Sequence, residues 1–124
     1  MLFSVGSHPV FARDSIEGSF IEFSEPETLD LYGLGADGLL TKRADNWLNQ
    51  ETPLSASLFD DDALIFQNIQ SRTICLKCKN ESRIIELYND HAPDIGFWAK
   101  PGAPYVCIEP WFGFDDAPDR DGLF

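Results

Sequence analysis

The run Tyr105-Val106-Cys107-Ile108-Glu109-Pro110-Trp111 places a single carboxylate among apolar, β-branched and aromatic residues. This composition predicts a β-strand. A charged carboxylate in apolar surroundings destabilises the folded protein unless it is paired with an opposite charge or hydrogen-bond donors. Such a carboxylate is also found where its raised pKa serves a reaction. Glu109 is therefore either a solvated residue of an edge strand or a functional carboxylate. The second reading suits a sugar site, because Trp111 would offer a flat apolar surface beside a proton acceptor.

The same β pattern extends outward from this run over most of the chain. Apolar or alternating segments predict strands at residues 2–5, 19–24, 28–34, 64–66, 73–79, 83–88, 94–99 and 105–109. Residues 80–82 are polar and predict a hairpin turn. Residues 44–60 are the least β-like and are expected to hold one helical turn. The predicted fold class is all-β.

Composition limits the possible functions. The chain of 124 residues is one domain at most, and its hydrophobic content of 44% is typical of a globular fold. Nine Lys and Arg against 21 Asp and Glu give a net charge of −12, which disfavours nucleic acid and makes a neutral substrate more natural than an anionic one. No apolar run reaches the length of a membrane span, and the first residues lack the features of a signal peptide. We expect a cytoplasmic protein that contacts neither membrane nor nucleic acid.

Three motifs suggest cofactors or metals, and each has a simpler explanation. The three cysteines are an odd number, and Cys75 and Cys78 lie in a predicted strand, where residues three apart point to opposite faces. Residues 33–38 match GxGxxG, but no long helix follows, so a hairpin loop is expected. Residues 60–62 are three aspartates without a calcium-loop pattern. We expect no metal and no cofactor.

Only two histidines are present, and they differ in setting. His91 lies in a predicted loop and should be exposed. His8 ends an apolar strand, and Pro9 restricts its backbone to extended conformations. A histidine held in this way near a carboxylate can donate or accept a proton near neutral pH, although a structural role is the commoner one for a histidine considered alone.

Four segments in order carry a family resemblance. They are residues 4–11 (SVGSHPVF), 62–66 (DALIF), 94–98 (DIGFW) and 103–111 (APYVCIEPW). Together they resemble the aldose 1-epimerase (galactose mutarotase-like) superfamily, especially its bacterial branch of mutarotase-related proteins. The resemblance implies an antiparallel β-sandwich, part of a β-supersandwich. It also implies that residues 1–124 form a single, incomplete domain, corresponding to the C-terminal part of the family fold.

The resemblance also implies a chemistry. The family interconverts the α and β anomers of a free aldose, such as an aldohexose, without a cofactor. Glu109 matches the general base and His8 the general acid, while Asp62 matches a sugar-binding aspartate. Trp98 and Trp111 are candidates for lining the pocket. The family also holds its sugar with a basic or histidine residue from an N-terminal half that is absent from this sequence.

Two alternatives remain at this stage. The chain could be a non-catalytic carbohydrate-binding β-sandwich, in which the tryptophans bind sugar without any reaction. It could also be an inactive truncated fragment, because both ends of the sequence resemble interrupted strands. Unpaired sheet edges would then favour a homodimer.

Overall fold

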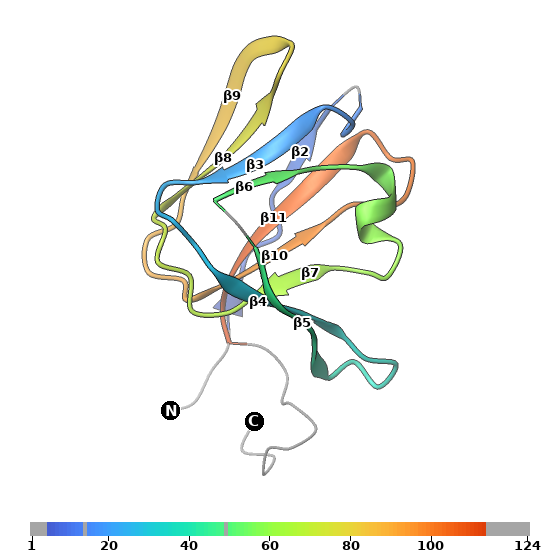
Figure 1. The fold of residues 1–124 in the computed structure, drawn as a ribbon, viewed down its shortest axis with the longest axis vertical. Coiled ribbons are helices and arrows are strands. Elements are labelled where there is room, and N and C mark those ends of the chain that lie inside the picture. Colours follow the sequence, from blue (N-terminus) through green and yellow to red (C-terminus); the bar gives the residue numbers. More distant parts are fainter. Residues whose placement is uncertain (1–4, 14, 49, 114–124) are drawn as a thin grey trace.

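Two antiparallel β-sheets make up most of the computed structural model, which describes residues 5–13, 15–48 and 50–113 (Figure 1). The larger sheet has the order β1 (Val5–Gly6), β11 (Tyr105–Phe112), β10 (Asp94–Trp98), β7 (Leu64–Phe66), β4 (Leu29–Leu34) and β5 (Leu40–Leu48), and β2 (Val10–Ala12) also pairs with β11. The smaller sheet has the order β6 (Glu51–Pro53), β3 (Ser19–Phe23), β8 (Thr73–Cys78) and β9 (Glu81–Tyr88). The predicted all-β, antiparallel sandwich is confirmed.

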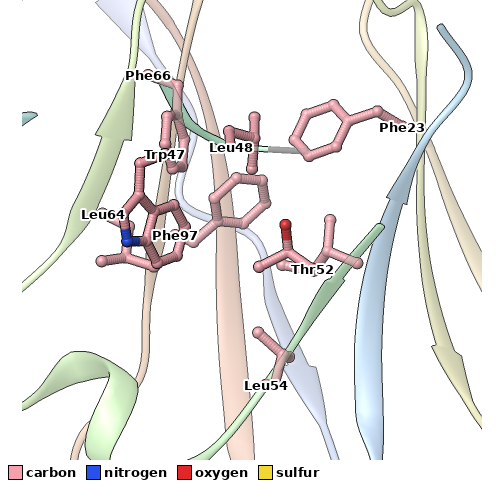
Figure 2. Close-up of a pocket in the computed structure, with 9 residues that line it drawn as sticks. Phe23, Trp47, Leu48, Thr52, Leu54, Leu64, Phe66 and Phe97 are labelled. Carbon is pink, nitrogen blue, oxygen red and sulfur yellow. The ribbon is translucent and has the colours of Figure 1, made fainter. Parts of the chain in front are cut away.

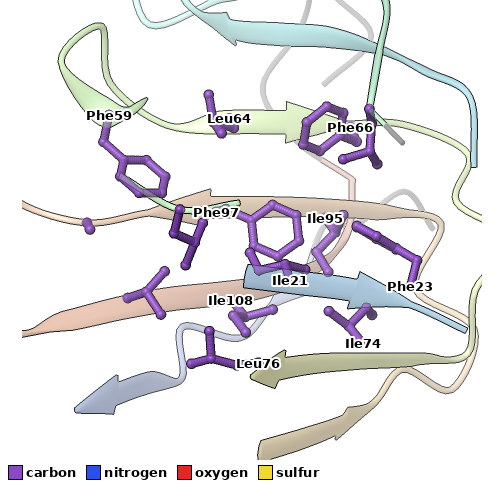
Figure 3. Packing of buried hydrophobic residues seen from close by; sticks show 14 of the residues in the cluster. Ile21, Phe23, Phe59, Leu64, Phe66, Ile74, Leu76, Ile95, Phe97 and Ile108 are labelled. Atoms are coloured by element: carbon purple, nitrogen blue, oxygen red, sulfur yellow. The ribbon is translucent and has the colours of Figure 1, made fainter. Parts of the chain in front are cut away.

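The hydrophobic core lies between the inner faces of the two sheets (Figure 3). Strand alternation explains its membership, because every second residue of a strand points to the same face. The smaller sheet contributes Ile21, Phe23, Ile74 and Leu76, and the larger sheet contributes Leu64, Phe66, Ile95, Phe97, Val106 and Ile108. The ring of Phe97 packs edge-on against Phe23 and tilted against Phe66, with centroids 6.0 and 6.1 Å apart.

Most predicted strands are present, with small shifts at their ends. The predicted hairpin of residues 73–88 is formed by β8 and β9, although its turn is shorter than expected. The GxGxxG segment forms the end of β4 and most of the hairpin loop to β5, close to the prediction, with Gly38 at a positive φ of 80°. His91 is exposed in a loop, also as predicted. Residues 2–4 of the first predicted strand and the acidic segment 115–122 lie outside the described residues.

The prediction for residues 44–60 is wrong over much of its length. Strand β5 extends to Leu48, and β6 follows at Glu51–Pro53. Most of β5 faces solvent at the edge of the larger sheet, and its pairing with β4 contains register shifts, so its sequence lacks a clear alternation. The expected helical turn is present as a 3₁₀ helix, η1 (Ala56–Phe59).

Candidate functional site

The candidate site lies on the outer face of the larger sheet, on β11 and its neighbours. Val106 and Ile108 of β11 point into the core, so the intervening residues, Cys107 and Glu109, point outward together with Trp111. On β10, Gly96 pairs with Glu109 and Trp98 with Cys107. These residues therefore share one face.

His8 is brought opposite Glu109 by the register of the neighbouring edge segment. Gly6 pairs with Trp111 and Val10 with Cys107, and the same register between these pairs sets His8 against Glu109. Backbone bonds on either side join Ser7 N to the Pro110 carbonyl at 3.2 Å and Ile108 N to the Pro9 carbonyl at 3.3 Å. His8 and Glu109 thus occupy a non-hydrogen-bonded cross-strand position, where side chains approach most closely.

The two side chains are in direct contact. Nδ1 of His8 lies 3.1 Å from Oε1 of Glu109, and the side chains are 59% and 10% exposed. The pair therefore joins a solvent-facing imidazole to a carboxylate that is nearly excluded from water. The predicted acid and base lie on the same face of the sheet and directly opposite each other. Their side chains are in contact, so there is no gap between them for a pyranose.

Burial dominates the electrostatics of Glu109. Loss of hydration raises the pKa of Glu109, while the nearby His8 and a hydrogen bond from Trp111 act in the opposite direction. The indole N–H is the only donor that a tryptophan side chain offers. Apolar surroundings were expected to raise this pKa, and they do. A carboxylate with a raised pKa is a stronger proton acceptor than an ordinary one once it is ionised.

Trp111 lies flat against the sheet across two glycines. A Cβ added to Gly6 would be 2.8 Å from Cδ1 of Trp111, and one added to Gly96 would be 3.1 Å from Cζ2. The indole therefore extends from β1 across β11 to β10 because both neighbouring strands lack a side chain there. The result is a partly exposed aromatic surface beside Glu109.

Trp98 and Asp62, the other predicted sugar-binding residues, are less closely connected to the pair. Trp98 is half-buried on the same face, two positions along β10 from Gly96, and its ring lies 6.2 Å from that of Tyr105. Asp62 is exposed in the turn before β7, with a φ of 81°, and its carboxylate accepts the N–H of Ala63 at 2.8 Å. That hydrogen bond gives Asp62 a local role in the turn.

Sequence reasoning did not identify two buried residues of this face, Asp94 and Cys107. Asp94 pairs with Trp111 across the strands and accepts the N–H of Asn68 at 3.2 Å, and burial raises its pKa. Cys107 is 1% exposed, and its sulfur belongs to a group with His8 and Glu109 in which the ligand-type atoms lie within 4.8 Å of one another. Two-residue alternation along β10 and β11 could have placed both residues on the site face.

The cavity drawn in Figure 2 is separate from this site. It lies inside the sandwich, has a volume of about 10 Å³ and is lined almost entirely by apolar side chains, including Trp47, which stacks on Phe66. A space of that size holds at most about one water molecule. This cavity is therefore too small to hold a sugar.

Comparisons with known proteins agree with the resemblance found in the sequence. The chain is 28% identical over 133 aligned positions to the plasmid and chromosomal forms of protein LacX from Lactococcus lactis subsp. lactis, covering 99% of this chain and 44% of each relative. No protein-family model matches. The chain thus spans less than half the length of the curated relatives it matches.

Solved structures show the same similarity. A galactose mutarotase related enzyme from Lactobacillus acidophilus superposes with a TM-score of 0.78 at 28% identity, covering 97% of this chain and 43% of that one. A galactose mutarotase-like protein from Lactobacillus casei superposes with a TM-score of 0.81 at 21% identity, covering 94% and 44%. The predicted resemblance to galactose mutarotase-related proteins is confirmed. Within the described residues, no helix is long and apolar enough to cross a membrane.

Proposed function

We propose that this protein is an aldose 1-epimerase-like isomerase that interconverts the α and β anomers of a neutral aldohexose, with residues 1–124 forming part of one mutarotase-like domain. The observation that carries the proposal is the contact between the His8 imidazole and the buried carboxylate of Glu109. Acid–base catalysis needs two such groups within reach of the same substrate. The net charge of −12 supports a neutral sugar over a sugar phosphate.

In the proposed reaction, the Glu109 carboxylate takes the proton of the anomeric hydroxyl while the His8 imidazolium protonates the ring oxygen. The bond between C1 and the ring oxygen breaks, and an open-chain aldehyde forms. Rotation about C1–C2 presents the other face of the carbonyl, and the reverse proton transfers close the ring. Each group ends in the protonation state in which it began, so no cofactor is consumed.

The sugar has to enter by separating the pair. Since the side chain of His8 is mostly exposed and lies on an edge segment, its rotation disturbs little packing, whereas Glu109 is held within the sheet. The ion-pair contact that is lost is worth about 1 kcal/mol when one partner is solvated. The indole of Trp111 would receive the apolar face of the sugar, and Trp98 and Asp62 would extend the binding surface beyond it.

Polarimetry of freshly dissolved α-glucose or α-galactose tests the proposal. We expect the protein to accelerate mutarotation, and Glu109→Gln and His8→Asn each to reduce that acceleration by about 10²- to 10⁴-fold. His91→Asn is the matched control, because His91 is the exposed histidine paired with Asp90 and should behave as the wild type. Full activity in His8→Asn would exclude the assigned acid. Sugar binding without acceleration in the wild type would support a carbohydrate-binding module instead.

We further propose a cytoplasmic location, supported by the three cysteines, which are all free.

A further inference from the structure

Three side chains of the outer face bring a nitrogen, a sulfur and an oxygen together. The ligand-type atoms of His8, Cys107 and Glu109 lie within 4.8 Å of one another, and among the described residues they form the one such group of three. Cys107 and Glu109 are two residues apart on β11 and point to the same side, and His8 is held opposite Glu109. The sheet register therefore assembles the group.

The geometry of this group is close to that of a zinc site. Zinc binds His nitrogen at about 2.0–2.1 Å, carboxylate oxygen at about 2.0–2.2 Å and thiolate at about 2.3 Å, so ligand atoms around a tetrahedral ion lie roughly 3.3–3.8 Å apart. The nitrogen and oxygen are already 3.1 Å apart. The sulfur lies within 4.8 Å of both atoms, so it would have to move closer by at most roughly 1–1.5 Å to reach this spacing. Magnesium and calcium fit poorly, because they prefer oxygen ligands.

Charge and access also favour a divalent ion here. Cys107 and Glu109 are almost completely buried, so two negative charges at this point would be costly without a cation. One Zn²⁺ with one thiolate and one carboxylate is neutral overall. His8 faces solvent, which leaves an entry path and an open fourth position for water.

We propose that His8, Cys107 and Glu109 form a Zn²⁺ site in which the ion replaces the direct contact between His8 and Glu109. Binding releases the thiol proton of Cys107, together with any proton held by the other two ligands, to the solvent. The sequence did not suggest this site because its ligands are about a hundred residues apart and follow no metal-binding spacing. If the proposed function is correct, the ion occupies both the acid and the base and inhibits mutarotation.

Titration of the full chain with Zn²⁺ in a calorimeter, without sugar, tests binding directly. We expect one ion per chain, with proton release that depends on the ionisation heat of the buffer. His8→Asn should weaken binding by at least about tenfold, and it should leave folding intact because His8 is mostly exposed. His91→Asn should bind as the wild type. No binding at a few equivalents, or equal binding by His8→Asn, would overturn the site.

Cobalt identifies the sulfur ligand. Co²⁺ in place of zinc should give a thiolate-to-cobalt charge-transfer band in the near ultraviolet, which Cys107→Ser removes and the double variant Cys75→Ser/Cys78→Ser retains. The opposite pattern would assign the metal to the other cysteines and refute the proposal. Because these measurements use no sugar, a protein that binds zinc through Cys107 but accelerates no mutarotation would reject the proposed function and leave the metal site standing.

Discussion

Replacing Glu109 with glutamine should make the protein more stable at neutral and alkaline pH. The ionised carboxylate is 10% exposed, and the effective penalty for burying an ion is several kcal/mol. Its contact with His8 stabilises the ionised carboxylate by only about 1 kcal/mol, because His8 is largely solvated. The hydrogen bond from Trp111 stabilises the carboxylate by about 1 kcal/mol more, and the variant keeps this contribution because the glutamine oxygen can still accept the bond. We expect Glu109→Gln to gain about 1–2 kcal/mol at pH 8, which is the net of these opposing contributions.

The direction of the pH dependence follows from the raised pKa. Burial lifts the pKa of Glu109 above its ordinary value of 4.5, so the folded protein binds this proton more tightly than the unfolded chain does. The stability that this proton contributes is present at low pH and is lost as the pH rises through the folded-state pKa. A tenfold difference in proton affinity between the folded and unfolded chains corresponds to about 1.4 kcal/mol of stability. Glutamine does not titrate, so the advantage of the variant should grow from pH 4 to pH 8.

Urea unfolding followed by tryptophan fluorescence measures both quantities, and subtracting the wild-type curve cancels the titration of the other carboxylates. Glu27→Gln is the matched control, because Glu27 is also buried but accepts the N–H groups of Gln70 and Ser71 at 2.9 and 2.7 Å. It should lose about 1–3 kcal/mol. A Glu109→Gln variant less stable than the wild type by more than about 1 kcal/mol at pH 8 would refute the reasoning.

Two further predictions concern the tryptophan surface and the sheet edges. Gly6→Ala should displace the Trp111 indole more than Gly96→Ala does, because the added Cβ would approach the ring to 2.8 Å rather than 3.1 Å. The KM for the sugar should therefore rise more in Gly6→Ala than in Gly96→Ala. Equal KM values in the two variants would contradict the proposed role of Trp111. The edge strand β5 leaves backbone groups unpaired in the described structure, so we expect the protein to form a homodimer. Size-exclusion chromatography with light scattering measures the oligomeric state, and a stable monomer of 13.9 kDa would contradict this prediction.

Local pattern was sufficient for strands that lie in the interior of a sheet. Residues 19–23 and 73–78 show a buried inner face, and their alternation is visible in the sequence. It was insufficient for β5, where the edge position leaves polar residues on both faces and the alternation is lost. A strand can be predicted from the sequence when one of its faces is buried, because burial imposes an alternation of apolar and polar residues. The prediction therefore failed for β5, where burial is weakest.

The candidate site was likewise predicted only in part. His8, Glu109 and Trp111 were identified from their local settings and the family resemblance, and the structure brings these three together. Asp94, Cys107 and the two glycines under the indole were missed, because their importance depends on what lies on the adjacent strand. A cross-strand neighbour is set by register, and register is a property of the folded sheet.

By itself, the sequence determined that this protein is an all-β chain with an acidic surface, and that a carboxylate lies within an apolar strand. Its resemblance to the mutarotase-like proteins also suggested which residues could act on a sugar. Only the tertiary structure decided that His8 and Glu109 are direct partners, 3.1 Å apart, and that a buried sulfur lies beside them. The physical reason is that alternation along one strand selects the face of each side chain, whereas the pairing of distant strands selects its neighbours.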